Sequence, residues 1–264
     1  MYKFQNIFFI FFLSLSVNSQ VLNTDRIMVS DTLIKKISGN VDISFTSDKV
    51  KNNVLDGSSK IELFRFFKNN YFIVASLIND FTLNGKDVLQ NEGFIQVRLR
   101  DNDSREWSIE LYIQNQWNGA LGMKYRNVVG NNLRKRFFEK KKFDLYSGLG
   151  TFYEIEEWNW DGVENLNNYE NTPNLKRTLL RLNHYWKVAY KFNDNVDISA
   201  ITYFQFPLNQ NFINLRWFFD LNTYVKMTKK TSFIIHFDST YDTYRMVPIS
   251  DFYYSFNFGI QYTW

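Results

Sequence analysis

The sequence predicts an all-β fold, namely a closed, antiparallel, up-and-down β-barrel of about twelve strands. Three observations support this prediction. Aromatic residues make up 19% of the 264 residues, with only 11 glycines and 3 prolines, a composition typical of extended strands. The mean hydropathy is −0.35, so the chain as a whole is polar. From Asn40 onward, segments of roughly ten residues alternate in polarity and are separated by polar turns.

Residues 1–19 have the pattern of a secretory signal peptide. Lys3 precedes a short apolar stretch at residues 7–15, and residues 17–19 are small enough for cleavage. The stretch is too short to span a bilayer as a helix, and a retained anchor is the alternative. Residues 20–38 show no pattern, so we expect a short periplasmic lead-in there and the barrel in residues 39–264.

The last segment shows the alternation most clearly. From Phe252 to Trp264 every even position is aromatic or apolar, while Ser255, Asn257 and Gln261 on the odd positions are polar. Successive side chains of a strand point to opposite faces, so one face is apolar and the other polar. In order, the segments are residues 41–45, 61–67, 71–83, 94–100, 107–117, 121–133, 144–156, 180–188, 196–206, 213–226, 232–238 and 252–264.

The second segment has ambiguous faces, because Phe64 and Phe66 compete with Ile61 and Leu63 for the apolar side. The number of segments is even, as is usual for a closed bacterial barrel. A sheet in lipid must close because an unpaired strand edge is costly there. A polar face alternating with an apolar face therefore predicts a transmembrane barrel with an apolar exterior and a wet interior.

Aromatic residues indicate where the membrane surfaces lie. Trp107 and Trp117 share one apolar face ten positions apart, which places them about 25 Å apart along the membrane normal, the height of the apolar band of such barrels. Aromatic rings with a polar group favour the interfaces of a bilayer. The aromatic residues expected there are Trp107, Trp117, Trp217, Tyr262 and Trp264.

Turn lengths give a further expectation. If both termini are periplasmic, the periplasmic turns are short and comprise residues 69–70, 101–105, 139–142, 193–195 and 229–230. The opposite set is expected to be longer on average, with residues 48–57, 84–93, 158–174 and 243–250, although residues 118–120 and 208–211 are short.

Charged side chains on the polar faces are the candidate functional residues. The lumen-lining candidates are Arg98, Arg100, Glu110, Lys124, Arg126, Asp144, Glu154, Arg181, Lys187, Arg216, Asp220, His236 and Asp238. If the turn at residues 118–120 sets the register, Glu110 lies one diagonal step from Arg126. Opposite charges in a narrow lumen tend to pair. Two outcomes stay open, a network that plugs the barrel and a narrow pore for small polar or anionic solutes.

Composition excludes several other kinds of function. The chain has no cysteine, which removes disulfides and thiolate metal sites, and with two histidines we expect no metal site and no cofactor. The net charge of +4 comes without a basic patch for nucleic acid. Gly148 and Gly150 lie inside a strand, so they are expected to thin the wall or to make room for a bulky neighbour rather than bind a nucleotide.

Two alternatives to a non-enzymatic barrel stay open. His236 shares a strand face with Asp238, which makes an outer-membrane lipid hydrolase or deacylase worth testing. That chemistry needs a nucleophile within about 3 Å of the histidine, and catalysis on lipid needs an outward residue, whereas the alternation turns His236 inward. His184 falls on the outward face. The second alternative is a soluble, secreted β-sheet binding protein.

Three stretches resemble a known family. They are Gly39–Ser47 (GNVDISFTS), Gly122–Gly130 (GMKYRNVVG) and Tyr146–Glu154 (YSGLGTFYE), and a loose similarity extends over residues 39–264. On these the chain resembles the salt-induced outer-membrane proteins, a family of barrels without an established activity. The chain departs from that pattern after the first strand, where Asp48–Lys51 (DKVK) replaces a run of small polar residues.

The resemblance implies an outer-membrane barrel of uncertain role, with no catalytic residues. We expect a location in the outer membrane of a Gram-negative bacterium and a role either as a narrow pore or as an envelope-stress component. Tyr262 and Trp264 resemble the aromatic C-terminal signal read by the barrel-assembly machinery. Outer-membrane lipids and that machinery are thus the expected partners, and the protein is expected to be monomeric.

Overall fold

The structure, a computed structural model, describes residues 37–49, 53–67, 71–85, 87–101, 106–163, 172–208 and 214–264. The predicted signal peptide and nearly all of the predicted lead-in lie outside these residues. Within them no helix is long and apolar enough to cross a membrane.

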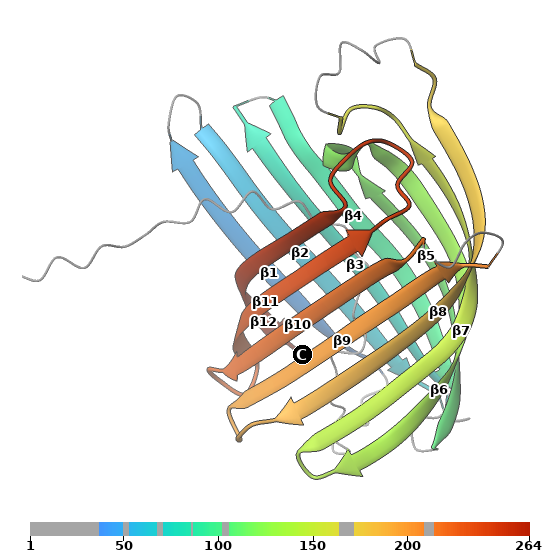
Figure 1. Cartoon of the computed structure of the whole chain (residues 1–264). Coiled ribbons are helices and arrows are strands. Elements are labelled where there is room, and N and C mark those ends of the chain that lie inside the picture. The colour runs from blue at the N-terminus through green and yellow to red at the C-terminus, as the bar shows by residue number, and fades with distance from the viewer. Residues whose placement is uncertain are drawn as a thin grey trace, which may run out of the picture.

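Twelve strands form one closed antiparallel barrel, which confirms the predicted fold (Figure 1). Each strand pairs with its neighbours in sequence, and β1 pairs with β12 to close the ring. The strands are β1 (Ser38–Lys49), β2 (Asn53–Phe66), β3 (Tyr71–Asn84), β4 (Asp87–Asp101), β5 (Trp107–Asn118), β6 (Met123–Lys140), β7 (Phe143–Trp158), β8 (Leu175–Lys191), β9 (Val196–Pro207), β10 (Arg216–Lys226), β11 (Thr231–Asp242) and β12 (Phe252–Thr263).

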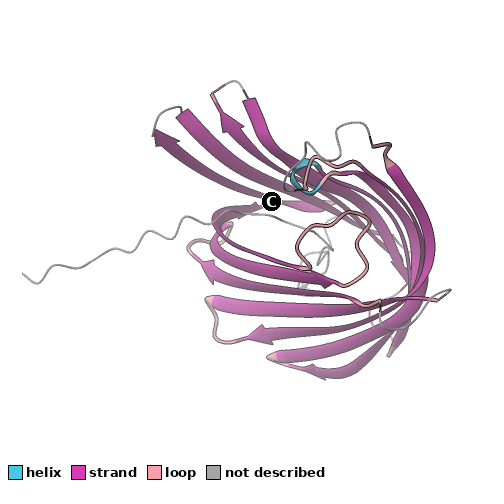
Figure 2. Ribbon diagram, turned by 45° about the horizontal axis from the view of Figure 1, so that its top comes forward, coloured by secondary structure: helices cyan, strands magenta, loops and turns pink. Residues whose placement is uncertain are grey.

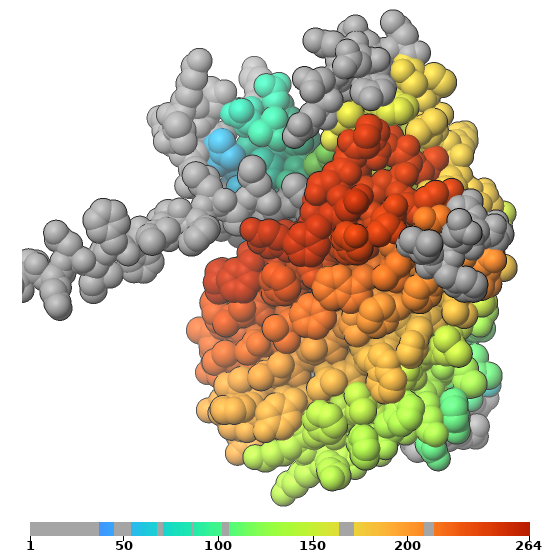
Figure 3. All heavy atoms as spheres, viewed as in Figure 1, coloured from blue at the N-terminus to red at the C-terminus, as the bar shows by residue number. Residues whose placement is uncertain are grey.

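The alternation in the sequence becomes an inside and an outside. On β5, Ile109, Leu111 and Ile113 are about half exposed on the outer wall, while Glu110 and Tyr112 between them are buried. The ambiguous second segment is resolved in the same way, because the outer positions of β2 are Ile61 and Leu63, and Phe64 points inward. The outer wall of β7–β12 is a continuous surface of side chains (Figure 3).

Two of the connections that were expected to be long are shorter than predicted. β3 ends at Asn84 and β4 begins at Asp87, and β1 ends at Lys49 and β2 begins at Asn53. Residues 48–57 and 84–93 are therefore mostly strand. Their polar composition is typical of loops, but here it belongs to the ends of long strands, which carry many polar side chains. The expected long connections 158–174 and 243–250 do lie between strands.

One end of the barrel is covered by a compact cluster that we call the mouth cap. It comprises residues 119–123, including the 3-10 turn η1 (Gly119–Leu121), residues 158–163 and residues 243–251. Leu121, Met123, Trp158, Val163 and Val247 form its buried core. Residues 243–251 join β11 to β12, yet they pack on β6 and β7, so this connection crosses the opening (Figure 2).

Candidate functional site in the barrel interior

The structure places most of the candidate lumen residues inside the barrel. The inward, buried ones are Arg98, Arg100, Glu110, Arg126, Glu154, Arg181, Lys187, Arg216, Asp220 and Asp238. Asp144 and His236 also belong to the inward faces of β7 and β11 but are only half-buried. The polar face of each strand therefore forms a tightly packed interior.

Lys124 does not lie with the others, and its predicted place in the lumen is wrong. Its side chain is exposed and its Nζ contacts Glu157 Oε1 at 3.0 Å. Glu157 shares the outer face of β7 with Tyr153 and Ile155. A register shift on β6 between Met123 and Tyr125 is the cause, because one extra residue reverses the alternation at that point.

Glu110 on β5 is the centre of the first ionic cluster. Arg100 contacts Glu110 Oε1 at 2.8 Å, and Arg98 and Arg134 approach the carboxylate at 3.5 and 4.0 Å. Tyr185 Oη, from β8, donates to Glu110 Oε2 at 2.9 Å. Three guanidinium groups thus surround one buried carboxylate, and the hydroxyl of Tyr185 reaches it from a strand three positions away in the sheet.

Glu154 on β7 is the centre of the second cluster. Its carboxylate accepts from Arg126 at 2.7 Å, from Arg216 at 3.1 Å, and from Arg181. Arg216, on β10, also contacts Asp242 at 2.7 Å. This network joins β6, β7, β8, β10 and β11 through the interior, so it connects opposite parts of the wall.

The register between β5 and β6 differs from the one expected. Glu110 is paired with Asn132, and Arg126 is paired with Gln116, so Glu110 and Arg126 do not form the expected diagonal pair. The 3-10 turn η1 and Gly122, which has a φ of 80°, lengthen the connection beyond the simple turn that the sequence suggested. A longer turn shifts every pair along the ladder.

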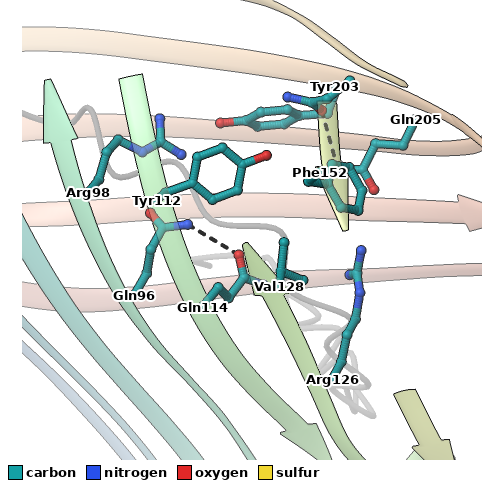
Figure 4. Close-up of a pocket in the computed structure, with 10 residues that line it drawn as sticks. Gln96, Arg98, Tyr112, Gln114, Arg126, Val128, Phe152, Tyr203 and Gln205 are labelled. Carbon is teal, nitrogen blue, oxygen red and sulfur yellow. Dashed lines mark hydrogen bonds between the residues drawn. The ribbon is translucent and has the colours of Figure 1, made fainter. Parts of the chain in front are cut away.

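A small cavity lies between the two clusters (Figure 4). Its volume is about 20 Å³, which is room for roughly one water molecule. Arg98 and Arg126 project into it from β4 and β6, and Gln96 donates to Gln114 at 3.1 Å along its edge. The lining contains two arginines, amides, and the rings of Tyr112, Phe152 and Tyr203, but no carboxylate.

Carboxylates gather on the other side of the interior. His236 Nε2 lies 2.9 Å from Asp220 Oδ2 and 3.8 Å from Asp238 Oδ1, and Ser255 Oγ donates to Asp238 at 2.6 Å. On β4–β8 the inward cations are Arg98, Arg100, Arg126, Arg134, Arg136, Arg177, Arg181, Lys187 and Lys191, against Glu92, Glu110, Glu139, Asp144, Glu154 and Glu156. On the remaining strands the inward carboxylates are Asp42, Asp56, Glu62, Asp80, Asp197, Asp220, Asp238 and Asp242, against Lys60, Arg216 and Lys226. The interior therefore has a cationic half and an anionic half.

The mouth cap has polar ties to the network below it. Arg177 donates to the backbone oxygen of Tyr244 at 2.8 Å and contacts Glu156 at 3.2 Å. Arg245 of the cap stacks 4.5 Å from the ring centre of Tyr253 on β12. Burial lowers the pKa of the Arg245 guanidinium from its ordinary value. The cap is thus coupled to the ionic network through Arg177.

The candidate interface aromatics all lie on the outer face. Trp107, Tyr262 and Trp264 are exposed. Trp117 and Trp217 are half-buried, and their Nε1 atoms donate to Asn91 at 3.2 Å and to Thr202 at 2.8 Å. Their depth in a bilayer stays a prediction.

Several members of the site were missed by sequence reasoning. Arg134 and Asp242 continue the alternation of Arg126 and Asp238, so the same periodicity extended by a few residues would have found them. Tyr185 is an aromatic inward residue whose partner, Glu110, lies far away in sequence. No local pattern predicts that contact.

The two histidines have different surroundings. In the described part of the chain His236 contacts carboxylates, and Ser255 bonds to Asp238 rather than to the imidazole. His184, on the outer face, has its Nε2 3.0 Å from Ser147 Oγ, a contact that the sequence did not reveal. The described residues contain no group of three or more His, Asp or Glu side chains arranged to hold a metal ion.

The chain matches no protein-family model and no curated protein, so the resemblance to salt-induced outer-membrane proteins stays a prediction. Among solved structures, the NanC porin is similar with 11% identity and a TM-score of 0.47, covering 85% of this chain and 98% of that one. The KdgM porin, in complex with disordered oligogalacturonate, has 10% identity and a TM-score of 0.44, covering 86% and 99%. The anion-selective porin from Comamonas acidovorans has 8% identity and a TM-score of 0.41, covering 86% and 98%. Likeness at this level indicates no substrate, and the assignment of a closed barrel rests on the strand pairing of this chain.

Proposed function

We propose that the protein is a non-enzymatic barrel of the Gram-negative outer membrane that forms a narrow pore for small polar and anionic solutes. The observation that carries the proposal is the small cavity between the two ionic clusters. Two arginines line it without a carboxylate, so its local potential favours an anion. Its volume of about 20 Å³ leaves room for roughly one water molecule, so we expect only small solutes to pass.

Membrane location is supported by the distribution of apolar side chains. Most of the exposed large hydrophobic residues lie on the outer faces of strands around the ring, whereas the interior contains many charged side chains. In a bilayer the ladders between neighbouring strands satisfy most of the backbone, and the apolar exterior meets lipid. We place both termini in the periplasm, so that the mouth cap faces the cell exterior.

Planar-bilayer recordings in a potassium chloride gradient test this function. We expect small, discrete current steps with a reversal potential on the anion-selective side. Arg98→Gln removes one cavity arginine while Arg100 still pairs with Glu110, so anion preference should fall by about threefold or more. Lys135→Gln, on the outer face, is the matched control and should leave selectivity unchanged. Cation preference in the unmodified protein would refute the proposal, and silence in all variants would identify a plugged barrel.

One observation favours a second candidate, a lipid hydrolase acting from the outer face. Ser147 and His184 form a nucleophile–base contact at 3.0 Å, and outward groups have access to lipid esters. Two facts weigh against it. Ser147 Oγ also donates to the backbone oxygen of Tyr185 at 3.0 Å. Among the described residues, the side-chain contacts of His184 are with Ser147 and Trp186, and no carboxylate orients the imidazole.

Labelling with a serine-reactive fluorophosphonate separates the two candidates. The unmodified protein in phospholipid vesicles should remain unlabelled and should release no fatty acid. Labelling that disappears in both Ser147→Ala and His184→Gln would establish the hydrolase instead.

A further inference from the structure

The barrel closes through an incomplete seam. β1 pairs with β2 along its whole length, from Ser38 to Lys49, but it pairs with β12 only from Asn40 to Ile43. β12 likewise pairs with β11 from Phe252 to Tyr262. The ladder ends at Ile43, and toward the end of β1 the two strands diverge in both views (Figures 1 and 2). No other neighbouring pair among the described strands has so short a ladder.

A cavity of about 60 Å³ lies at this seam. Its lining includes inward residues such as Asp42, Asn257 and His236, and also Ile43 and Phe258, which belong to the outer face. Residues of both faces line one space, so the wall is thin here and the interior approaches the membrane side. This position differs from that of the arginine-lined cavity between the ionic clusters.

An unclosed ladder is costly in hydrocarbon, because the free backbone groups of both edges must find partners. Water or the polar end of a guest molecule that enters between the strands can satisfy them. The apolar side chains at the outer side of the seam, Ile43 and Phe258, suit the hydrocarbon part of the same guest.

The charge of the surrounding wall selects the kind of guest. Asp42 and Asp80 line the seam cavity, and Asp220 and Asp238 lie behind His236. The cation in the lining, Lys60, contacts Glu62 at 2.7 Å. A cationic head group is therefore favoured over an anionic one.

We propose that the β1–β12 seam is a lateral portal through which single-chain cationic amphiphiles pass between the barrel interior and the membrane. This inference goes beyond the axial pore proposed above and uses a different part of the wall. Either function can fail without the other, because conductance measures the axial path, whereas photolabelling of the interior through the seam measures the lateral path.

A reversible lock tests the portal. A Cβ built on Gly259 lies 3.7 Å from Ser44 Cβ, within the usual range for a disulfide. The chain has no cysteine of its own, so Ser44→Cys with Gly259→Cys places a single crosslink across the seam. Ser59→Cys with Asn79→Cys, across the fully paired β2–β3 ladder, is the matched control.

The probe is an alkyl trimethylammonium with a photoreactive group near its head, added to vesicles that contain the full-length protein. We expect photolabelling of interior residues such as Ile78 and Asn257, mapped by mass spectrometry. Oxidation of the seam variant should reduce this labelling at least tenfold, and reduction of the same sample should restore it. The control disulfide should have no effect. Since one sample is compared before and after reduction, a folding defect cannot imitate the result.

A carboxylate amphiphile with the same chain should label the interior at least fivefold less. Labelling confined to outer residues, or interior labelling that is indifferent to the seam disulfide, would overturn the portal. Equal labelling by the two amphiphiles would overturn the charge preference.

Discussion

Individual side chains in the interior are interdependent because each carboxylate compensates several arginines. Glu110 is fully buried and lies near Arg98, Arg100 and Arg134. Glu110→Gln would remove the negative charge that these three guanidinium groups contact and leave an excess of positive charge in the cluster. We expect the free energy of unfolding to fall by about 3–5 kcal/mol, measured by urea titration in vesicles with tryptophan fluorescence.

The control for this substitution is Glu139→Gln. Glu139 forms a surface pair with Arg136 at 2.5 Å and its side chain is largely exposed, so stability should change little. Equal effects of the two substitutions would show that the Glu110 cluster is hydrated and not a buried network.

One glycine of the predicted pair makes room for a ring, as the sequence suggested. A Cβ on Gly148 would lie 2.1 Å from the ring of Tyr185, the residue that donates to Glu110. Gly148→Ala should therefore displace Tyr185 and cost about 1–3 kcal/mol in the same urea titration. Gly259→Ala, whose Cβ meets nothing closer than 3.5 Å, should be neutral or slightly stabilising. A destabilising Gly259→Ala with a harmless Gly148→Ala would contradict this account.

The strands and their inward and outward faces could be predicted from the sequence much more completely than the contacts between side chains. Period-two alternation predicts every strand and most inward residues, because the two faces of each strand have different environments. It fails at Lys124 and at the Glu110–Arg126 pair, where a bulge and the lengthened η1 turn shift the register. Bulges and turn conformations depend on packing around one residue, so period-two patterns do not reveal them.

The mouth cap is the element that most directly controls access to the interior. Val247 is buried among Leu121, Met123, Trp158 and Val163. Val247→Asp would place a carboxylate in this apolar core and open the cap, while the barrel ladder would remain intact. We expect single-channel conductance to rise by about twofold or more, with an unchanged heat-dependent gel shift. Val247 carries no strand pairing, so loss of the gel shift would contradict a separable cap.

Pro248→Asp is the matched control for the cap. Pro248 is exposed directly beside Val247, so the same charge there should leave conductance at the level of the unmodified protein. A rise in both variants would assign the effect to charge near the opening and not to loss of the apolar core.

For the whole molecule, both proposed functions require that the outer wall of the barrel faces lipid. Leu111 lies near the middle of the stretch between Trp107 and Trp117 on the outer face of β5, and half of its surface is exposed. In water, an arginine at such an exposed position would cost almost nothing. At the centre of a bilayer, an outward arginine in a barrel costs about 2–4 kcal/mol, and near the interface only about 0–1 kcal/mol. Leu111→Arg should therefore reduce the unfolding free energy in vesicles by the larger amount.

Phe192→Arg provides the comparison at a strand end. Phe192 is exposed in the turn after β8, where we expect the head-group region, so its substitution should have a small effect. Both variants replace an exposed apolar side chain with arginine. The difference in their unfolding free energies therefore reflects the depth of the position in the bilayer and not a general effect of arginine. If Leu111→Arg is as harmless as Phe192→Arg, the outer wall faces water, and neither the axial pore nor the lateral portal has a membrane in which to act.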